Sequence, residues 1–312
     1  MRVKTNTKTL TNSPVAETIP PSAEVPVPKE MTIPKKVVNS RKVPDGKESS
    51  TSAFKQPNRK IKRSQIHLWI PNQHGAWVMV LCPPFSGLLA GGFSWTGLWL
   101  CLVWLVCYLV SYTVGRWLVS RRAKRFFRPA ATYSIIALVL GIPLVILQPH
   151  LLWWSPVYLV VLAAHLWAAH SRNQRSLWAN GSAVIGSGLT ALLTASLGTT
   201  STSLLPAVGV VVAIAYILQE FGVVLFVKTM FRERDSKLYL TVSLLWHIGL
   251  CGLGFWTSWP TGVSSLFLLA RSAVLPAYAK RLTPLQIGLF EIAASLTSFI
   301  GITWGTTLST FV

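Results

Sequence analysis

Ionisable side chains inside long apolar stretches are the least ordinary feature of this sequence. Five of them lie in five different stretches: His165, Glu220, His247, Arg271 and Glu291. Counted along a helix from the nearer charged end, each lies roughly 10–15 Å inside its stretch. A charge at such a depth in hydrocarbon costs about 2.5–3.5 kcal/mol and usually faces a partner or a cavity. We therefore expect the five side chains to line one polar cavity.

Two interpretations of this polar layer remain open. In the functional one, Arg271 neutralises one carboxylate and the other takes up water, a proton or a ligand, so Glu220 and Glu291 are candidate acid–base residues. The substrate would then be bound by Arg271, His165, His247 and Gln219. In the structural one, Arg271 forms a buried ion pair that serves packing, and each histidine bonds a neighbouring helix.

A second polar segment, "PNQHGAW" at 71–77, leads directly into the first apolar stretch. Pro71 suits a break before a helix, and Asn72 is a residue type that caps one. His74 would then face the mouth of the bundle, as a third catalytic candidate beside the substrate-binding candidate Asn72. Alternatively, this polar turn only satisfies its own free amides.

The composition indicates that these residues belong to a membrane protein. Of the 312 residues 51% are hydrophobic and only 12% charged, with a mean hydropathy of +0.49. Soluble domains carry about twice that charged fraction. The sequence predicts an all-α, polytopic membrane bundle with about nine transmembrane helices. The predicted spans are 76–93, 95–115, 130–147, 151–170, 179–198, 203–227, 238–256, 259–279 and 284–305.

The basic residues are distributed by topology. Of the 29 Lys and Arg residues, fourteen precede residue 64, fourteen lie in four alternate connections, and only Arg271 lies within a span. The positive-inside rule places these connections in the cytoplasm, with the N-terminus cytoplasmic and the C-terminus outside. We expect a bacterial inner membrane, or an internal photosynthetic one. A net charge of +20 distributed in this way does not indicate nucleic-acid binding.

Residues 1–65 are rich in Pro, Ser, Thr and Lys, and we expect a disordered basic cytoplasmic tail there, ahead of a transmembrane domain at 66–312. Its last basic cluster is suited to anionic lipid headgroups, or only sets the orientation. The basic connections have a similar pair of interpretations: a phosphate clamp, or topology alone. Their substrate-binding candidates are Arg121, Arg125, Arg175, Arg232 and Arg234.

Small residues and cysteines are interpreted as packing residues. Gly87 and Gly91, and the segment 180–188, would allow helix backbones to approach closely. The four cysteines lie in apolar runs without a CxxC spacing. No motif identifies a metal or another cofactor, and no nucleophile motif is present.

Several segments resemble the YwiC-like family of bacterial integral membrane proteins. They are the segment 71–77, the basic connection after the second span, "RSLWANG" at 175–181 and "FVKTMFRERDSKLYLTVSLLWH" at 226–247. The resemblance covers roughly residue 66 to the C-terminus, and it implies a fold and a topology rather than an activity.

The sequence is also similar, more weakly, to the UbiA-type intramembrane prenyltransferases. That similarity implies nine helices and an active site in two connections: connection 2–3, between the second and third predicted spans (116–129), and connection 6–7, between the sixth and seventh (228–237). These are the two most charged connections here. The similarity also rests on "RNQRSLWANGSAVIGSGLTALL" at 172–193. Those enzymes hold Mg²⁺-diphosphate with Asp-rich motifs. Connection 2–3 has no Asp or Glu, and connection 6–7 has only Glu233 and Asp235.

Three functions are compatible with the sequence. The first is the binding of a lipidic or isoprenoid substrate in a cytoplasm-facing polar cavity, with its anionic head on the basic connections. The second is a proton-coupled transporter, since intramembrane Glu and His residues are typical of proton relays. The third is a membrane assembly or scaffolding protein, which only the basic tail suggests.

Overall fold

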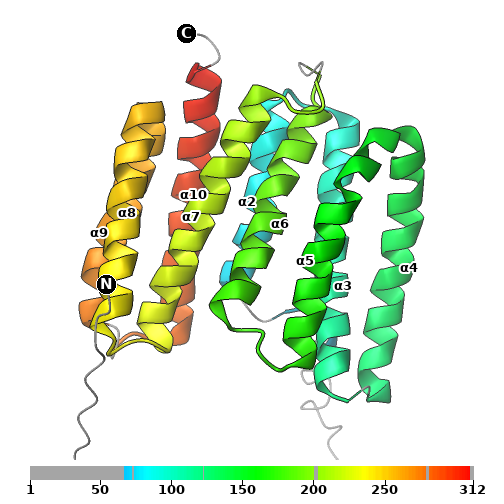
Figure 1. The fold of residues 1–312 in the computed structure, drawn as a ribbon, viewed down its shortest axis with the longest axis horizontal. Helices are drawn as coiled ribbons and strands as arrows, with labels where there is room; N and C mark the ends of the chain where they lie inside the picture. Colours follow the sequence, from blue (N-terminus) through cyan, green and yellow to red (C-terminus); the bar gives the residue numbers. More distant parts are fainter. Residues whose placement is uncertain (1–66, 72–73, 122, 200–202, 279–280, 310–312) are drawn as a thin grey trace, which may run out of the picture. The chain divides into compact units, whose positions relative to one another are not determined.

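A computed structural model describes residues 67–71, 74–121, 123–199, 203–278 and 281–309, all within the unit Pro57–Val312. The predicted disordered tail, residues 1–65, lies outside the described residues. Those described form helices and connections, without a strand. Figure 1 labels the helices α2 His74–Ala90, α3 Trp95–Val119, α4 Lys124–Leu147, η1 Pro149–Trp154, α5 Ser155–His170, α6 Leu177–Ser196, α7 Ala207–Phe231, α8 Lys237–Thr257, α9 Trp259–Tyr278 and α10 Pro284–Ser309.

The prediction of an all-α membrane bundle is confirmed. Within the described segments, six helical stretches are long and apolar enough to cross a membrane by length and composition: α3, α4, η1 with α5, α7, α8 and α10. The remaining three, α2, α6 and α9, also coincide with predicted spans. They are short or carry more small and polar residues, and α6 packs against α2, α3, α5 and α7, so few of its side chains face lipid.

The helix ends differ from the predicted spans by a few residues, and the largest difference lies at a basic connection. α3 continues to Val119 instead of 115, α4 begins at Lys124 instead of 130, and α7 continues to Phe231 instead of 227. Apolar composition marks the hydrocarbon limit, whereas backbone hydrogen bonds continue a helix past it. Long cationic side chains at these ends reach toward water and do not interrupt the helix.

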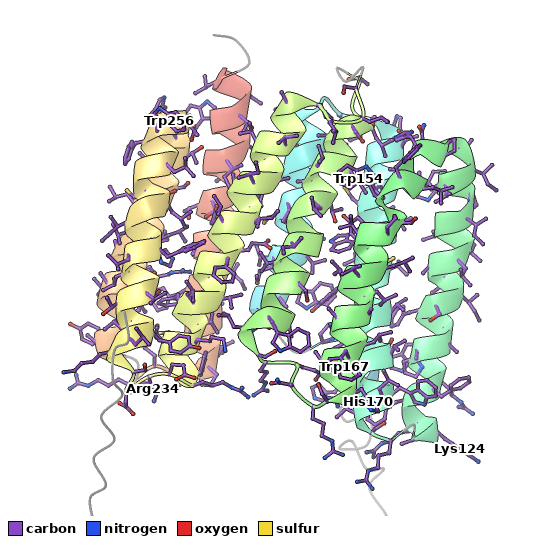
Figure 2. All side chains as sticks on the ribbon, viewed as in Figure 1. Lys124, Trp154, Trp167, His170, Arg234 and Trp256 are labelled. Carbon is purple, nitrogen blue, oxygen red and sulfur yellow. The ribbon has the colours of Figure 1, made fainter. Side chains whose placement is uncertain are left out.

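The helices form two connected groups around α2 and α6. On one side α3 packs against α4 and α5; on the other, α7, α8, α9 and α10 pack in turn, with α10 returning to α2 (Figure 1). Lys124, His170 and Arg234 lie at one end of the helices, hereafter the basic end, and Trp154 and Trp256 at the other, hereafter the tryptophan end (Figure 2). Trp256 is 84% exposed, as expected of a side chain at the membrane surface.

Close helix contacts confirm the predicted role of the small residues. A Cβ at Gly87 would overlap the Ala191 carbonyl of α6, and one at Gly91 would overlap Ala195. Gly188 of α6 approaches Ile217 of α7 in the same way. The backbones of α2, α6 and α7 therefore approach closely at the centre of the bundle.

Candidate functional site

Two consecutive prolines interrupt the hydrogen bonding of α2. Pro83 and Pro84 have no N–H, so they cannot donate to the carbonyls four residues earlier, at Met79 and Val80. Two other helices supply the missing donors. The Ser187 hydroxyl of α6 donates to the Met79 carbonyl at 2.6 Å, and the Trp104 indole N–H of α3 donates to the Val80 carbonyl at 3.1 Å. This replacement keeps an interrupted helix stable away from water.

The centre of the second helix group holds a buried ion pair. The Arg271 Nη1 of α9 donates to the Glu291 Oε1 of α10 at 2.7 Å, and the two side chains are 2% and 6% exposed. The guanidinium also lies over the Phe226 ring of α7, with its Cζ 4.1 Å from the ring centroid. This is a cation–π contact. Arg271 and Glu291 are thus brought together, as the interpretation of a paired arginine predicts.

Several polar atoms around this pair have no protein partner. They are Nε and Nη2 of Arg271, Oε2 of Glu291 and Nε2 of His247. The His247 Nδ1 lies 2.7 Å from the Ser243 carbonyl of its own helix, so only Nε2 is available to another group. Unmatched buried donors and acceptors are costly unless water or a ligand satisfies them. Arg271 thus has two donors without a protein partner, and Glu291 has one acceptor, at a place that neither of the hollows along α7 and α8 reaches.

Glu220 lies on another face of α7. It is six residues from Phe226, which places the two side chains about 120° apart around the helix. Its carboxylate is next to Cys82 of α2 and Ser187 of α6, and neither of its oxygens has a partner. Gln219 beside it is also buried. Glu220 therefore forms a second polar position, with α2 and α6, separate from the Arg271–Glu291 pair.

His165 belongs to the other helix group. Its Nε2 is 3.2 Å from the Ser111 carbonyl of α3, and it lies beside Gly115 of the same helix. The five ionisable residues predicted at one depth thus occupy three places: Arg271, Glu291 and His247 in one, Glu220 in another, and His165 in a third. Within the described residues, no three or more His, Cys, Asp or Glu side chains are grouped to hold a metal ion.

The start of α2 lies beside the buried pair. A Cβ at Gly75 would be 3.7 Å from the Glu291 Cβ, so the first turn of α2 packs against α10 there. The buried Pro71 accepts a hydrogen bond from the Trp77 indole at 3.3 Å. Asn72 and the His74 side chain lie outside what the structure describes. The first turn of α2 therefore reaches Glu291, and the role predicted for His74 stays a prediction.

Two hollows lie along α7 and α8. A groove of about 410 Å³ is lined by Leu218, Val242, Leu245, Trp246, Gly249, Leu250 and Leu253. It adjoins a hollow of about 190 Å³ between α7, α8, α9 and α10, which shares Leu218, Leu250 and Leu253 with the groove. Its polar lining includes Gln219, Ser265 and Thr261. Neither Arg271 nor Glu220 lines these hollows, and the second one extends toward the tryptophan end.

Comparison with known sequences places this architecture in a family. A profile described as "YwiC-like protein" matches residues 70–195, from the residue before the segment 71–77 to the last turn of α6. An uncharacterised protein of Haemophilus influenzae is 30% identical over 239 residues, which are 75% of this chain and 97% of the relative. The chain belongs to the YwiC-like family. The uncharacterised protein YwiC of Bacillus subtilis is 32% identical over 108 residues, 35% of this chain and 45% of that protein.

No solved structure matches this YwiC-like chain significantly. The similarity to UbiA-type prenyltransferases is therefore not shown. The profile match covers α2 to α6, which includes the prolines of α2, Trp104 and Ser187. The Arg271–Glu291 pair lies beyond the matched residues.

The basic residues of this YwiC-like protein lie mostly at the ends of helices. Arg125 of α4 lies over the buried Phe126 ring at 4.9 Å, and exposed Arg121 has a left-handed backbone, with φ at 54°. The Arg175 carbonyl accepts a hydrogen bond from Lys228 of α7 at 3.2 Å. Arg234 donates to the Met230 carbonyl at 2.9 Å, and Arg232 is exposed. The phosphate clamp predicted for these residues stays a prediction.

The sequence prediction gave no role to Trp104, included Ser187 only as a packing residue of the segment 180–188, and gave no role to Phe226. The first two are recoverable in part, because a Pro-Pro pair in an apolar run leaves two carbonyls that need outside donors. Which donors approach depends on helix packing. Phe226 gives no signal, since phenylalanine is ordinary in a membrane span.

Proposed function

We propose that this YwiC-like membrane protein binds a lipidic or isoprenoid ligand, with its chain in the groove between α7 and α8. The groove carries the proposal, because it is apolar along its length and opens to the surface that faces lipid. Leu245 on its wall is 63% exposed. From Val242 to Leu253 the groove follows α8 for roughly 16 Å, the form that an extended hydrocarbon chain requires.

The basic end supplies the position for an anionic head. Val242 lies about 7.5 Å along α8 from Lys237, the first residue of that helix. Arg232 and Arg234 precede α8 in the same connection and are exposed. A phosphate or carboxylate above the groove would thus meet three cations, and guanidinium groups bind such oxyanions with paired hydrogen bonds. Arg121, Arg125 and Arg175 extend this basic surface over the other connections.

The hollow that adjoins the groove is mostly apolar, but its few polar groups support a specific ligand over bulk lipid. A purely apolar groove accepts the chain of any bilayer lipid. Here Gln219, Thr261 and Ser265 offer hydrogen-bonding groups in the adjoining hollow, which Leu250 also lines. A ligand with a polar group along or at the end of its chain would therefore be preferred. Glu220 and Glu291 do not line the groove, so the proposal concerns binding, and their acid–base roles are not part of it.

Filling the groove tests the proposal. A Cβ at Gly249 meets no atom within 4 Å, so Gly249→Trp places its ring in the groove without moving the backbone. Ile248→Trp is the matched control, because Ile248 is exposed on the same helix and does not line the groove. Both variants and the wild type are purified in mild detergent, and the retained lipids are identified by mass spectrometry.

We expect a retained lipid species in the wild type and in Ile248→Trp, and its loss in Gly249→Trp. Arg232→Ala with Arg234→Ala should reduce retention of anionic species and spare neutral ones. The same retained lipids in Gly249→Trp as in the other two proteins would contradict the proposal.

We also propose an orientation, in a bacterial inner membrane or an internal photosynthetic one. The basic end faces the cytoplasm, because Lys and Arg collect there. The N-terminal tail would then be cytoplasmic and the C-terminus outside. The last basic cluster of the tail, within residues 55–63, would then meet anionic headgroups, at about 1 kcal/mol for each residue close to the surface.

A further inference from the structure

We infer that Glu220 is a reversible proton-binding site inside the membrane, built by α2, α6 and α7. The Glu220 side chain belongs to a residue only 5% exposed, and neither carboxylate oxygen has a hydrogen-bond partner. An unpaired carboxylate in such surroundings is costly, and binding a proton removes its charge.

The groups that face Glu220 do not supply a counter-charge. Cys82 faces it from α2, Ser187 from α6, and Tyr216 lies one turn away on α7 itself. None of these three is a cation. The Ser187 hydroxyl is next to the carboxylate, but its single proton goes to the Met79 carbonyl. The site therefore keeps an acidic group without a fixed donor.

The charged groups of the other helices that pack on α7 lie elsewhere. Arg271 of α9 and Glu291 of α10 pair with each other beside Phe226. His247 of α8 lies against Gly222, with its Nε2 3.3 Å from the position of a Cβ there. Gly222 is two residues from Glu220 and so roughly opposite it around the helix. None of these groups lies where it could serve as the counter-charge of an ionised Glu220.

A proton fits the site better than a metal cation. An interrupted helix next to a carboxylate can bind a monovalent cation through its free carbonyls. In this protein the carbonyls released by Pro83 and Pro84 already accept hydrogen bonds, from Ser187 and Trp104. Glu220 is then the only one of these oxygen groups that lacks a hydrogen bond. A single carboxylate suits a proton better than a metal cation, which needs several oxygen ligands.

Hydroxyl groups continue from Glu220 toward the tryptophan end. Tyr216 lies next to Ser86 of α2, whose hydroxyl is 2.6 Å from that of Thr303 on α10. The series ends at Thr303 among the described residues, because Thr306 donates to the backbone carbonyl of Thr303 at 3.0 Å and not to its hydroxyl. Each hydroxyl both donates and accepts, so Tyr216, Ser86 and Thr303 can pass a proton along this side of α7 once water joins them to Glu220, since neither Glu220 nor the Tyr216 hydroxyl has a direct partner. The series makes exchange possible where a closed apolar core would not.

Infrared difference spectroscopy tests the inference directly. Spectra of the wild type and of Glu220→Gln, in lipid, are recorded from acidic to alkaline pH, in H₂O and in D₂O. We expect the wild type to show the carbonyl stretch of a protonated carboxylic acid, shifted by D₂O, which disappears reversibly as the pH rises. Glu220→Gln should lack this band, and Glu291→Gln should retain it.

Two results would overturn the inference: a carboxylate at every pH, or an acid band that neither titrates nor exchanges. A second measurement covers a Glu220→Gln variant that fails to fold. A lipid-soluble carbodiimide adds to protonated carboxyl groups, and peptide mass spectrometry of the wild type then locates the adduct. Labelling at Glu220 that falls with rising pH supports the proton site, and pH-dependent labelling confined to other carboxyl groups contradicts it.

Discussion

The Ser187 hydroxyl of α6 donates a 2.6 Å hydrogen bond to the Met79 carbonyl of α2, the carbonyl that Pro83 leaves without its helical donor. One serine thus joins two helices and satisfies the group that a proline exposes. It also lies beside Glu220. The same residue therefore supports the fold and borders the proposed proton site. Its contribution to the fold can be measured separately, by restoring the helical donor of Met79.

Ser187→Ala should destabilise the protein by about 1–3 kcal/mol, the cost of a buried carbonyl without a partner. Pro83→Ala returns an N–H to α2 and gives Met79 its helical donor. In the Pro83→Ala background, Ser187→Ala should therefore cost clearly less. Unfolding midpoints of the four proteins in detergent measure this coupling. Equal effects of Ser187→Ala in both backgrounds would show that the hydroxyl does not serve the Met79 carbonyl.

The sequence predicts the depth of residues better than their direction. Arg271 and Glu291 were expected at similar heights, and they form an ion pair. Glu220 was expected at the same height, and it faces α2 and α6 instead. Height follows from the constant rise of a helix. Direction depends on which side of a helix is buried, and lipid and protein core are equally apolar, so the pattern of apolar residues gives no answer.

The contacts of α2 were predictable only in kind. Gly87 and Gly91 indicate a close helix neighbour, but the sequence does not say that the neighbour is α6, about a hundred residues later. Likewise, the position of His165 in a helix was predicted, and its contact with Ser111 depends on the packing of α3 and α5. Long-range pairing is set by the whole bundle.

Gly87→Ala should destabilise the protein by roughly 1–3 kcal/mol, because the added methyl group would overlap the Ala191 carbonyl of α6. Gly252→Ala is the control. A Cβ at Gly252 of α8 meets no atom within 4 Å, and alanine favours a helix over glycine by about 0.5–1 kcal/mol. Thermal unfolding should therefore shift in opposite directions. A harmless Gly87→Ala would mean that α2 and α6 are further apart than described.

Reporter fusions test the orientation. Alkaline phosphatase is active only outside the cytoplasm, so a fusion at Gly198, between α6 and α7, or at Ser258, between α8 and α9, should be active. Fusions at Arg175 or Arg234 should be inactive, because those connections carry the basic residues. The reverse pattern, or activity that does not alternate, would contradict the proposed topology.

Separate removal of the two members of the buried ion pair should be more harmful than their joint removal. Arg271→Leu leaves Glu291 without its counter-charge, and Glu291→Leu leaves the guanidinium with only the Phe226 ring. Breaking a buried pair from one side typically costs about 3–5 kcal/mol, whereas replacing both members by apolar residues is often tolerated. We expect the double variant to unfold at a higher temperature than either single one in the same detergent.

If the pair serves packing alone, the double variant should also retain the lipid found with the wild type. Loss of that lipid from a stable double variant would instead indicate that the unmatched Nε and Nη2 of Arg271 bind a ligand group.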